Sequence, residues 1–324
     1  MLQNRKIAVV IPAYRVEPQI GAVLDQMPDC VDRVFVVDDA SPDHLAEQIT
    51  GRGDRFSLIR HEKNRGVGGA TVTGIQAALA ENCDIVVKCD GDGQMDPRHI
   101  PALVNPLLAG VANHAKGCRF HHFGELKQMP RRRLIGNIVL TFLTKMSSGY
   151  WNVVDPVNGF FATTSDTLRR IPLARLSPRF FFETDFLIRL NIIEARVADV
   201  AFPACYGNEK SSLSVTRALF GFPPRLLAGL IRRVFWRYLF YDVSPVAVFS
   251  LVGICLCTFG LVFGAYHWIS GALQLRETGV GTVMLAVLPL ILGFQLLLQA
   301  IVLDIQNTPK HTSYSADGTV SGLK

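Results

Sequence analysis

Two long apolar segments near the end of the chain constrain its fold more than any other feature. Residues 244–270 and 280–303 contain no Asp, Glu, Lys or Arg, and the short loop between them carries Arg276 and Glu277. About 20 apolar residues are enough to cross the hydrocarbon core of a bilayer. The sequence therefore predicts two transmembrane helices, with the buried hairpin of a soluble protein as the alternative.

Basic residues gather beside these segments and contribute to a net charge of +6. The first segment is preceded by Arg217, Arg225, Arg232, Arg233 and Arg237, and the second is followed by Lys310 and Lys324. Because basic residues favour the cytoplasmic side of a membrane, we expect both termini in the cytoplasm. Residues 221–242 mix Arg with aromatic and aliphatic residues, which indicates an interfacial helix. No nucleic-acid-binding motif accompanies these charges, so the expected partner is a membrane.

The front of the chain alternates between strand and helix patterns. Apolar runs rich in β-branched residues at 7–11, 33–39, 56–62 and 83–90 predict four strands. Helical patterns separate them, such as the small-residue segment 66–82. This alternation predicts an α/β fold with a parallel, doubly wound, Rossmann-like sheet. Seven cysteines without a C-x-x-C pair favour a reduced domain that faces the cytosol.

Polar residues follow three of the predicted strands, at 12–14, 38–41 and 90–94. The carboxyl ends of parallel strands meet at one edge of a sheet, and ligands bind beyond that edge. Independent parts of the chain therefore bring polar groups to one rim, which is the expected ligand site.

The segment DGDGQMDP, residues 90–97, places three carboxylates directly after an apolar run. Asp90 and Asp92 have the spacing of a chelate for one Mg²⁺ or Mn²⁺ that leaves positions open for phosphate oxygens, with an Asp-rich turn as the alternative. Asp96 precedes Pro97, where a new helix is expected, and is predicted to cap it.

Other common motifs are excluded. An EF-hand loop that began at Asp90 would need Gly at position six and Glu at position twelve, where Met95 and Pro101 stand. Residues 66–71 lack the third glycine of the dinucleotide fingerprint, and no P-loop sequence occurs.

Five segments carry a more specific resemblance. They are VVIPAY, VVDDAS, NRGVGGA, DGDGQMDP and FFFETDFLIRL, in this order. Together they resemble family 2 glycosyltransferases of the GT-A fold, over residues 7 to about 215. With the two apolar segments, the chain is similar to polyprenyl-phosphate glycosyltransferases such as dolichol-phosphate mannose synthase and bactoprenol glucosyltransferase.

The resemblance implies a metal-dependent enzyme that uses Mg²⁺ or Mn²⁺. It would transfer a sugar, with inversion, from a UDP- or GDP-sugar to a membrane polyprenyl phosphate, for cell-envelope glycan or glycoprotein assembly. The expected location is a bacterial inner membrane, and a homo-oligomer is compatible with this reading. A processive or tethered family 2 polysaccharide glycosyltransferase and a non-catalytic membrane scaffold remain alternatives, although the Gln-x-x-Arg-Trp motif of processive synthases is absent.

The resemblance also implies a division of the chain into parts. These are a cytosolic catalytic domain at 1–215, juxtamembrane interfacial helices at 216–242, two transmembrane helices within 243–304, and a cytoplasmic tail at 305–324.

The donor site implied by the family contains many residues. The nucleotide sugar would contact Pro12, Ala13, Tyr14, Glu17, Asp38, Asp39, Gly66, Gly68, Asp90 and Gly91, and the metal Asp90, Asp92 and Gln94. The catalytic residues would be Asp92 and the acidic pair Glu183 and Asp185, which faces the acceptor. Helix capping is the alternative for Asp38 and Asp39, and the acidic pair also suits the first turn of a helix.

The lipid phosphate would be bound by basic and polar residues. The candidates are Arg119, Arg131, Arg133, Asn137, Lys210 and Ser211. A guanidinium can hold phosphate through two hydrogen bonds. Arg119 and Arg133 have the spacing of the family's arginine pair, whereas residues 206–213 depart from its Gly-Glu-Ser-Lys segment by an extra Asn and a changed order. A solvated basic face is the alternative. Asp155 and Asn158 match an acceptor-side loop or a simple turn.

Overall fold

The computed structural model describes residues 2–118, 131–202, 215–275 and 277–314. The chain divides into two compact units. The first contains Met1–Leu230 together with Pro309–Lys324, and the second contains Ile231–Thr308.

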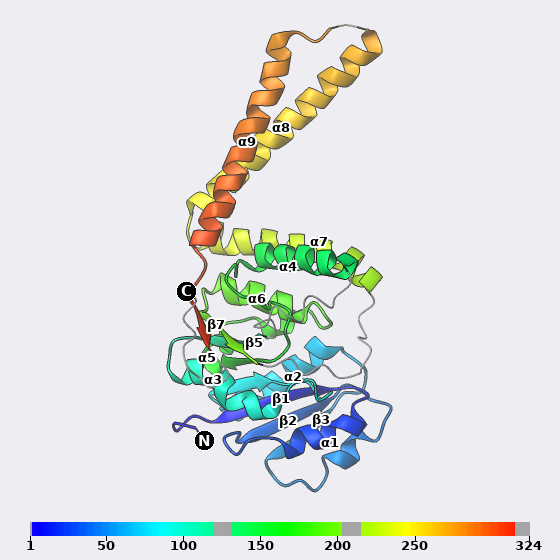
Figure 1. Ribbon diagram of the computed structural model, residues 1–324, viewed down its shortest axis with the longest axis vertical. Coiled ribbons are helices and arrows are strands. Elements are labelled where there is room, and N and C mark those ends of the chain that lie inside the picture. The colour runs from blue at the N-terminus through cyan, green and yellow to red at the C-terminus, as the bar shows by residue number, and fades with distance from the viewer. Residues whose placement is uncertain (1, 119–130, 203–214, 276, 315–324) are drawn as a thin grey trace. The chain divides into compact units, whose positions relative to one another are not determined.

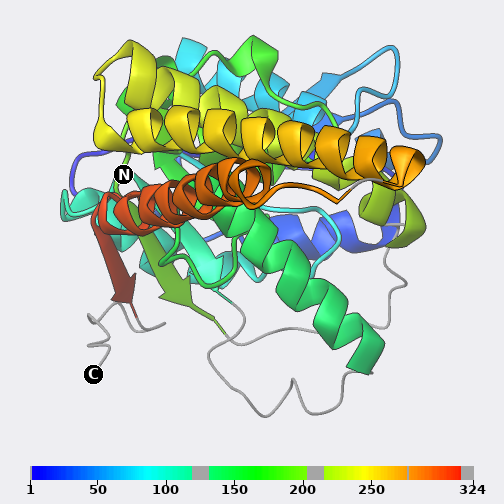
Figure 2. The same ribbon diagram turned by 90° about the horizontal axis from the view of Figure 1, so that it is seen from above.

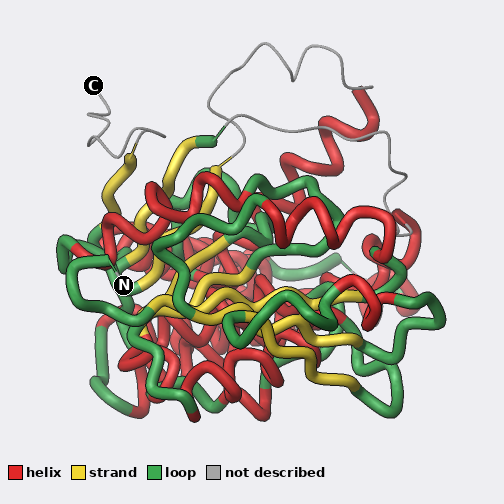
Figure 3. Tube along the Cα trace, turned by 90° about the horizontal axis from the view of Figure 1, so that it is seen from below, coloured by secondary structure: helices red, strands yellow, loops and turns green. Residues whose placement is uncertain are grey.

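The first unit is built on one mixed sheet whose strand order is β3-β2-β1-β4-β6-β5-β7-β8. Figure 3 shows these strands side by side in a single layer. Their bounds are β1 (Ile7–Ala13), β2 (Arg33–Asp38), β3 (Phe56–Arg60), β4 (Ile85–Lys88), β5 (His114–Cys118), β6 (Phe161–Thr164), β7 (Val197–Ala201) and β8 (His311–Tyr314). The four predicted strands are confirmed as β1 to β4, which pair in parallel.

The strand β6 follows the four predicted parallel strands in the sequence, and its direction differs from theirs. This strand runs antiparallel to both of its neighbours, β4 and β5. Its first residue, Phe161, pairs with Lys88, the last residue of β4. The loop 149–160 therefore brings the chain to the edge where the parallel strands end, and β6 starts there and runs back.

Helices cover both faces of the sheet (Figure 1). Their bounds are α1 (Glu17–Asp25), α2 (Val67–Ala80), α3 (Ile100–Leu108), α4 (Arg131–Ser148), α5 (Ser165–Arg169), α6 (Phe182–Ile192) and α7 (Val215–Arg233). Apolar side chains of α1 and α3 pack on one face, and those of α2, α5 and α6 pack on the other. The predicted helix at 66–82 is confirmed as α2.

An outer layer covers α6. Phe181 and Ile188 pack against Leu226 of α7. The hydroxyl of Ser147 in α4 donates a hydrogen bond of 2.8 Å to the carbonyl of Leu226. In Figure 1, α4 and α7 both lie on the side of α6 that faces away from the sheet. Apolar packing and this buried hydrogen bond hold the three helices together.

The C-terminal segment expected as a tail adds a strand to the sheet. Residues 311–314 form β8, which pairs in parallel with β7 from Val197↔His311 to Val200↔Tyr314. Tyr314 is 5% exposed and belongs to the same apolar core as Val200. The chain therefore returns to the first unit after it has left the second.

The second unit contains a π-helical turn (Val234–Phe240) and the helices α8 (Pro245–Gln274) and α9 (Val280–Gln306). Both helices are long and apolar enough to cross a membrane, as the segments 244–270 and 280–303 predict. Near the end of α9, the two carboxylate oxygens of Asp304 accept hydrogen bonds of 2.6 and 2.9 Å from the guanidinium of Arg233. The hydroxyl of Tyr238 donates a third, of 2.7 Å. A charge near the end of α9 is thereby compensated.

Small residues line the contact between α8 and α9, which run side by side (Figure 2). Buried positions recur every seven residues, at Val246, Gly253 and Gly260 on α8 and at Ala286, Gly293 and Ala300 on α9. A seven-residue period is that of a left-handed coiled coil, and small residues let helices approach closely in an apolar solvent.

We expect Gly260→Ala to weaken this hairpin. The added Cβ would lie 2.7 Å from the carbonyl oxygen of Ala286, a backbone atom that cannot move aside alone. Overpacking of this kind costs about 1–3 kcal/mol, so the melting temperature of the purified protein in detergent should fall. Gly281→Ala in α9 is the matched control, because nothing lies within 4 Å of its Cβ. Equal melting temperatures for the two variants would contradict the packing described.

Candidate functional site

A pocket of about 380 Å³ opens at the carboxyl ends of β1, β2 and β4. Its size lies within the range of small-molecule sites. Of the predicted donor-site residues it is lined by Pro12, Ala13, Tyr14, Asp39, Gly66, Asp90, Gly91 and Asp92. Residues that follow different parallel strands, far apart in the sequence, therefore meet at one edge of the sheet, as predicted. Arg179 and Phe180 also line the pocket and were missed by the sequence reasoning, although they lie in the motif FFFETDFLIRL or directly before it.

Two predicted donor residues, Glu17 and Asp38, bond to neighbouring loops and do not line this pocket. The carboxylate of Glu17 accepts a hydrogen bond of 2.9 Å from the backbone N–H of His44. That of Asp38 is buried, accepts one of 2.7 Å from the N–H of Ser41, and lies 3.3 Å from Nε of Arg60. These acids hold the turns that follow β1 and β2.

Asp39 is the organising residue of the loop that leads into α2. Its Oδ1 lies 2.7 Å from Nδ1 of His61 and accepts a hydrogen bond of 2.8 Å from the N–H of Arg65. Its Oδ2 accepts one of 2.7 Å from the N–H of Gly66. The other ring nitrogen of His61 lies 2.9 Å from Oγ1 of Thr73. Asp39 therefore fixes the pocket wall from within, and no sequence pattern pointed to His61 as its partner.

Two glycines let the start of α2 approach the segment before α6. Gly66 has a φ of +84°, and a Cβ there would lie 2.5 Å from the carbonyl oxygen of Pro178. At Gly68 a Cβ would overlap the carbonyl oxygen of Ser177 and lie 2.8 Å from Cβ of Phe182. Gly68 therefore serves this packing and does not line the pocket.

The metal-site candidates lie on the turn after β4. The side chain of Asp92 accepts a hydrogen bond of 3.0 Å from the N–H of Gln94, and Gln94 is exposed. The carboxylate of Asp96 accepts one of 2.9 Å from the N–H of Arg98 at the start of the 3₁₀ turn Pro97–His99, so the predicted cap is confirmed. The Arg98 guanidinium also lowers the pKa of Asp96.

Within the described ranges, no group of three or more His, Cys, Asp or Glu side chains could hold a metal ion. Asp90 and Asp92 nevertheless line the same pocket. Mg²⁺ usually binds through one or two carboxylates together with water and substrate phosphates. The donor set therefore fits a cation whose coordination is completed by a diphosphate.

Lys88 is a buried partner of the metal-site carboxylate that sequence reasoning missed. Its ammonium is 1% exposed and lies 2.7 Å from Oδ1 of Asp90 and 3.4 Å from Oε1 of Glu183. Burial alone would lower the pKa of Lys88, but the two carboxylates outweigh it and raise the pKa above its ordinary value. The one available signal was a lysine at the end of an apolar run, in VVKCD.

The acidic pair of α6 divides into two environments. Glu183 is partly buried and faces Lys88. Asp185 is 3% exposed, accepts a hydrogen bond of 3.0 Å from the N–H of Ser177, and lies 3.5 Å from Nε of Arg189. Asp185 therefore supports the segment that packs on α2, and Glu183 is the member nearer to the metal-site carboxylate.

The candidates for the lipid phosphate are placed only in part. Three of them lie outside the described residues: Arg119, Lys210 and Ser211. The other three lie in the N-terminal half of α4, where the structure does not describe their side chains: Arg131, Arg133 and Asn137.

The loop before β6 is attached to β5. Nδ2 of Asn158 donates a hydrogen bond of 2.8 Å to the carbonyl of Gly117, and the ammonium of Lys116 donates one to the carbonyl of Asn158. Burial lowers the pKa of Lys116 to about 8, although the carboxylates of Asp155, Glu183 and Asp199 oppose this. Lys116 was a further residue that the sequence reasoning missed.

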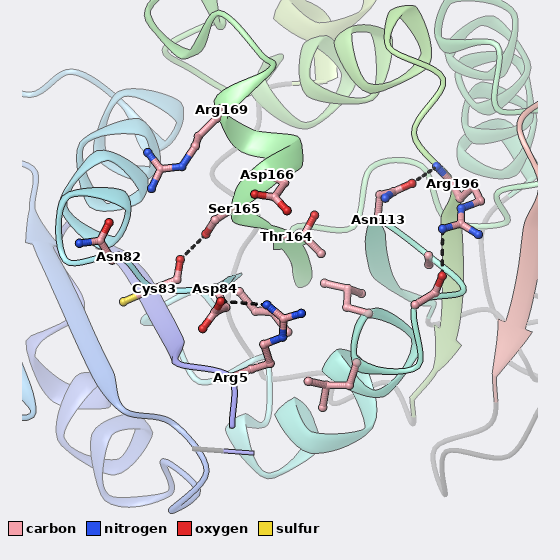
Figure 4. A pocket seen from close by; sticks show the side chains of 15 residues that line it. Arg5, Asn82, Cys83, Asp84, Asn113, Thr164, Ser165, Asp166, Arg169 and Arg196 are labelled. Carbon is pink, nitrogen blue, oxygen red and sulfur yellow. Dashed lines mark hydrogen bonds and ion pairs between the residues drawn. The ribbon is translucent and has the colours of Figure 1, made fainter. Parts of the chain in front are cut away.

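A second pocket, of about 430 Å³, lies at the opposite edge of the sheet, near the start of β4 (Figure 4). Two of its arginines bond to neighbouring parts of the chain. Arg5 lies 3.1 Å from a carboxylate oxygen of Asp84, and the guanidinium of Arg196 donates a hydrogen bond of 2.9 Å to the carbonyl of Gly110. We therefore place the functional site in the first pocket.

A pocket at the carboxyl ends of parallel strands, with two carboxylates on one turn beside it, is typical of ligand-binding enzymes with a doubly wound, Rossmann-like sheet. Residues 8–171 match the model of glycosyl transferase family 2. The chain belongs to this family, and it is a glycosyltransferase.

Proteins that are similar to this chain carry more specific names. The UDP-N-acetylglucosamine–dolichyl-phosphate N-acetylglucosaminyltransferase of Methanococcus voltae is 27% identical over 261 residues, which cover 76% of this chain and 99% of that protein. The undecaprenyl-phosphate mannosyltransferase of Micrococcus luteus is 27% identical over 60% of this chain and 82% of its own length. Glucosyl-3-phosphoglycerate synthase of Mycobacterium tuberculosis, solved with Mg²⁺ and UDP, has a TM-score of 0.52 at 24% identity, over 71% of this chain and 79% of that one.

We expect Asp39→Asn to destabilise the protein even without nucleotide. An amide NH₂ cannot accept the hydrogen bonds that the carboxylate receives from the N–H groups of Arg65 and Gly66. The loss should be about 1–3 kcal/mol, measured by thermal or denaturant unfolding of the ligand-free protein. Asp29→Asn, on an exposed turn, is the control. Wild-type stability of Asp39→Asn would mean that Asp39 acts on the nucleotide alone.

Lys116 should make stability depend on pH. Its pKa is about 8 in the folded chain against an ordinary 10.5, so the unfolded state binds more protons between these values. The destabilisation by this lysine is complete below pH 8 and is relieved as the pH rises toward 10.5, by up to about 3 kcal/mol. Unfolding of the wild type and of Lys116→Met should therefore converge or cross in this window. Parallel pH profiles would contradict the assignment.

Proposed function

We propose that this protein transfers a sugar from a UDP- or GDP-sugar to a membrane polyprenyl phosphate, with inversion at the anomeric carbon. The observation that carries the proposal is the meeting of Asp90, Asp92 and Tyr14 in one pocket of a family 2 transferase whose chain also contains two helices able to span a bilayer. The names of the two relatives that act on dolichyl and undecaprenyl phosphate support the acceptor.

The donor would occupy the pocket at the strand ends. Tyr14 is 43% exposed, so its ring offers surface on which a base can stack. The Arg15 guanidinium lies over the ring, 5.3 Å from its centroid. Arg179 lines the same pocket and provides positive charge for a diphosphate.

Asp90 and Asp92 would hold the Mg²⁺ or Mn²⁺, with Gln94 beside them on the same turn. Bound there, the cation supplies Lewis-acid stabilisation of the negative charge on the departing diphosphate. The complexes of the mycobacterial synthase with Mg²⁺ and with Mn²⁺ support this choice of cation.

The acceptor phosphate would attack the anomeric carbon as an anion. A new bond forms from a phosphate oxygen to that carbon while the bond to the diphosphate oxygen breaks on the opposite side, so an α-linked donor gives a β-linked product. Because the attacking oxygen is already ionised, no strong general base is required. Asp185, held by Ser177 and Arg189, would act as an orienting residue, and Glu183 would face the acceptor side.

The hairpin would keep the catalytic unit where the lipid phosphate emerges from the bilayer. The chain leaves the first unit at Leu230 and returns to it at Pro309, which supports a location of both hairpin ends on the side of the catalytic unit. The basic residues before α8 make that side the cytoplasmic one, in a bacterial inner membrane. The product would then supply cell-envelope glycan or glycoprotein assembly.

Membranes that contain the protein should transfer label from a nucleotide sugar into a short, lipid-extractable product. The assay uses a panel of labelled UDP- and GDP-sugars with Mg²⁺ or Mn²⁺ and undecaprenyl phosphate. NMR of the purified product should show the inverted anomer. Label in polymer would instead support a polysaccharide glycosyltransferase, and no transfer from any sugar would support a non-catalytic scaffold.

Asp92→Asn should lower the transfer rate by about a hundredfold or more, because the cation loses a charged ligand while the membrane helices are untouched. The rate is measured in the same lipid-extraction assay at equal amounts of inserted protein. Asp29→Asn, which makes the same chemical change on an exposed turn outside the pocket, should keep the wild-type rate. Full activity of Asp92→Asn would remove Asp92 from the site.

A further inference from the structure

The ammonium of Lys88 occupies a position between the donor side and the acceptor side of the site. It lies 2.7 Å from Asp90, a carboxylate of the metal turn, and 3.4 Å from Glu183, the acid nearer to the acceptor. Lys88 closes β4, whereas Glu183 lies in the first turn of α6, so the contact joins two elements that are distant in the sequence. The ammonium of Lys88 therefore contacts two acids. The proposed function assigns Asp90 to the donor and Glu183 to the acceptor side.

The surrounding backbone is shaped to admit this ammonium. Gly159 lies against it, and a Cβ at this position would overlap Nζ of Lys88 and lie 3.2 Å from Oδ2 of Asp90. The backbone N–H of Asp90 in turn lies 3.4 Å from Sδ of Met95, which fixes the turn. The side chain of Lys88 is 1% exposed and that of Asp90 is 26% exposed, so water screens the attraction between them only in part. The position is built for a permanently seated positive charge.

We propose that Lys88 is a positioning residue that competes with the divalent cation for Asp90, so that the cation binds tightly only together with a nucleotide diphosphate. Before the donor arrives, the ammonium compensates Asp90 and holds it in place next to Glu183. A lone Mn²⁺ or Mg²⁺ must draw Asp90 away from this partner and sit close to a like charge. When the metal ion arrives together with a diphosphate, the negative charge of the diphosphate offsets that repulsion. The ammonium of Lys88 then stays beside Glu183. The proposal rests on the metal-assisted transfer described above.

The test measures the affinity of the full-length protein in detergent for Mn²⁺, by the EPR signal of the free ion, with and without UDP or GDP. In the wild type, the nucleotide should raise Mn²⁺ affinity strongly. Lys88→Met removes the charge at similar length, and should raise the affinity for Mn²⁺ alone by about tenfold and reduce the effect of the nucleotide by a similar factor.

Lys116→Met is the matched control. Lys116 is a second buried lysine in the same row of the sheet, since it and Lys88 both pair with Phe161, but its ammonium bonds to the carbonyl of Asn158. Lys116 acts on Glu183 only through space and contacts no carboxylate of the metal turn, so its loss should change Mn²⁺ affinity much less than the loss of Lys88. An equal effect of both substitutions would show a general loss of buried charge and overturn the proposal.

Glu183→Gln gives a change of opposite sign. With one carboxylate fewer, the ammonium of Lys88 is drawn to Asp90 alone, so the affinity for Mn²⁺ without nucleotide should fall. Loss of a nearby carboxylate also weakens cation binding directly, so in the Lys88→Met background the same substitution should have a smaller effect. Equal effects of Glu183→Gln in both backgrounds would contradict the competition.

The experiment distinguishes failure of the proposed function from failure of this inference. If the wild type does not bind Mn²⁺ even with UDP or GDP, the metal role in the proposed function fails, and this inference fails with it. If the wild type binds Mn²⁺ with nucleotide but Lys88→Met has the same affinities, the competition is wrong and the proposed function stands.

Discussion

The shared ammonium of Lys88 is the interaction on which the site depends. Acids gathered at one edge of a sheet repel each other, and repulsion in a buried setting would push some of them toward the neutral form. Here each acid has a particular compensation: Asp39 receives backbone N–H groups, Asp185 lies beside Ser177 and Arg189, and Asp90 shares Lys88 with Glu183. These contacts order the rim before any ligand enters.

The first half of the fold could be predicted because its strands are apolar and its helices follow at regular spacing. The strand β5 and the direction of β6 were harder to predict. The sequence of β5 is His-Ala-Lys-Gly-Cys, in which the buried polar residues His114 and Lys116 interrupt the apolar pattern of a strand. The direction of β6 depends on which edge of the sheet the preceding loop reaches, and β8 on pairing with a strand that is distant in the sequence. Local patterns contain neither kind of information.

The site, like the fold, could be predicted from the sequence only in part. The rule for parallel strand ends was enough to bring Tyr14, Asp39 and Asp90 to one pocket. The orientation of each acid was not predictable, because spacing cannot tell whether a carboxylate faces a ligand or a neighbouring N–H group. The two buried lysines were missed because lysine is almost always exposed unless it is paired. Their partners come from α6 and from the loop before β6, and only the folded chain brings these together.

The sheet of the first unit cannot be completed until the end of the chain has been synthesised, because its last strand, β8, follows both long helices in the sequence. Both long helices lie between β7 and β8 in the sequence, yet β8 completes the sheet beside β7. Until α9 has been synthesised, β7 is left with an open edge, which is the kind of surface that pairs with other chains. The sheet thus reaches its final strand order only after both helices of the hairpin have been synthesised.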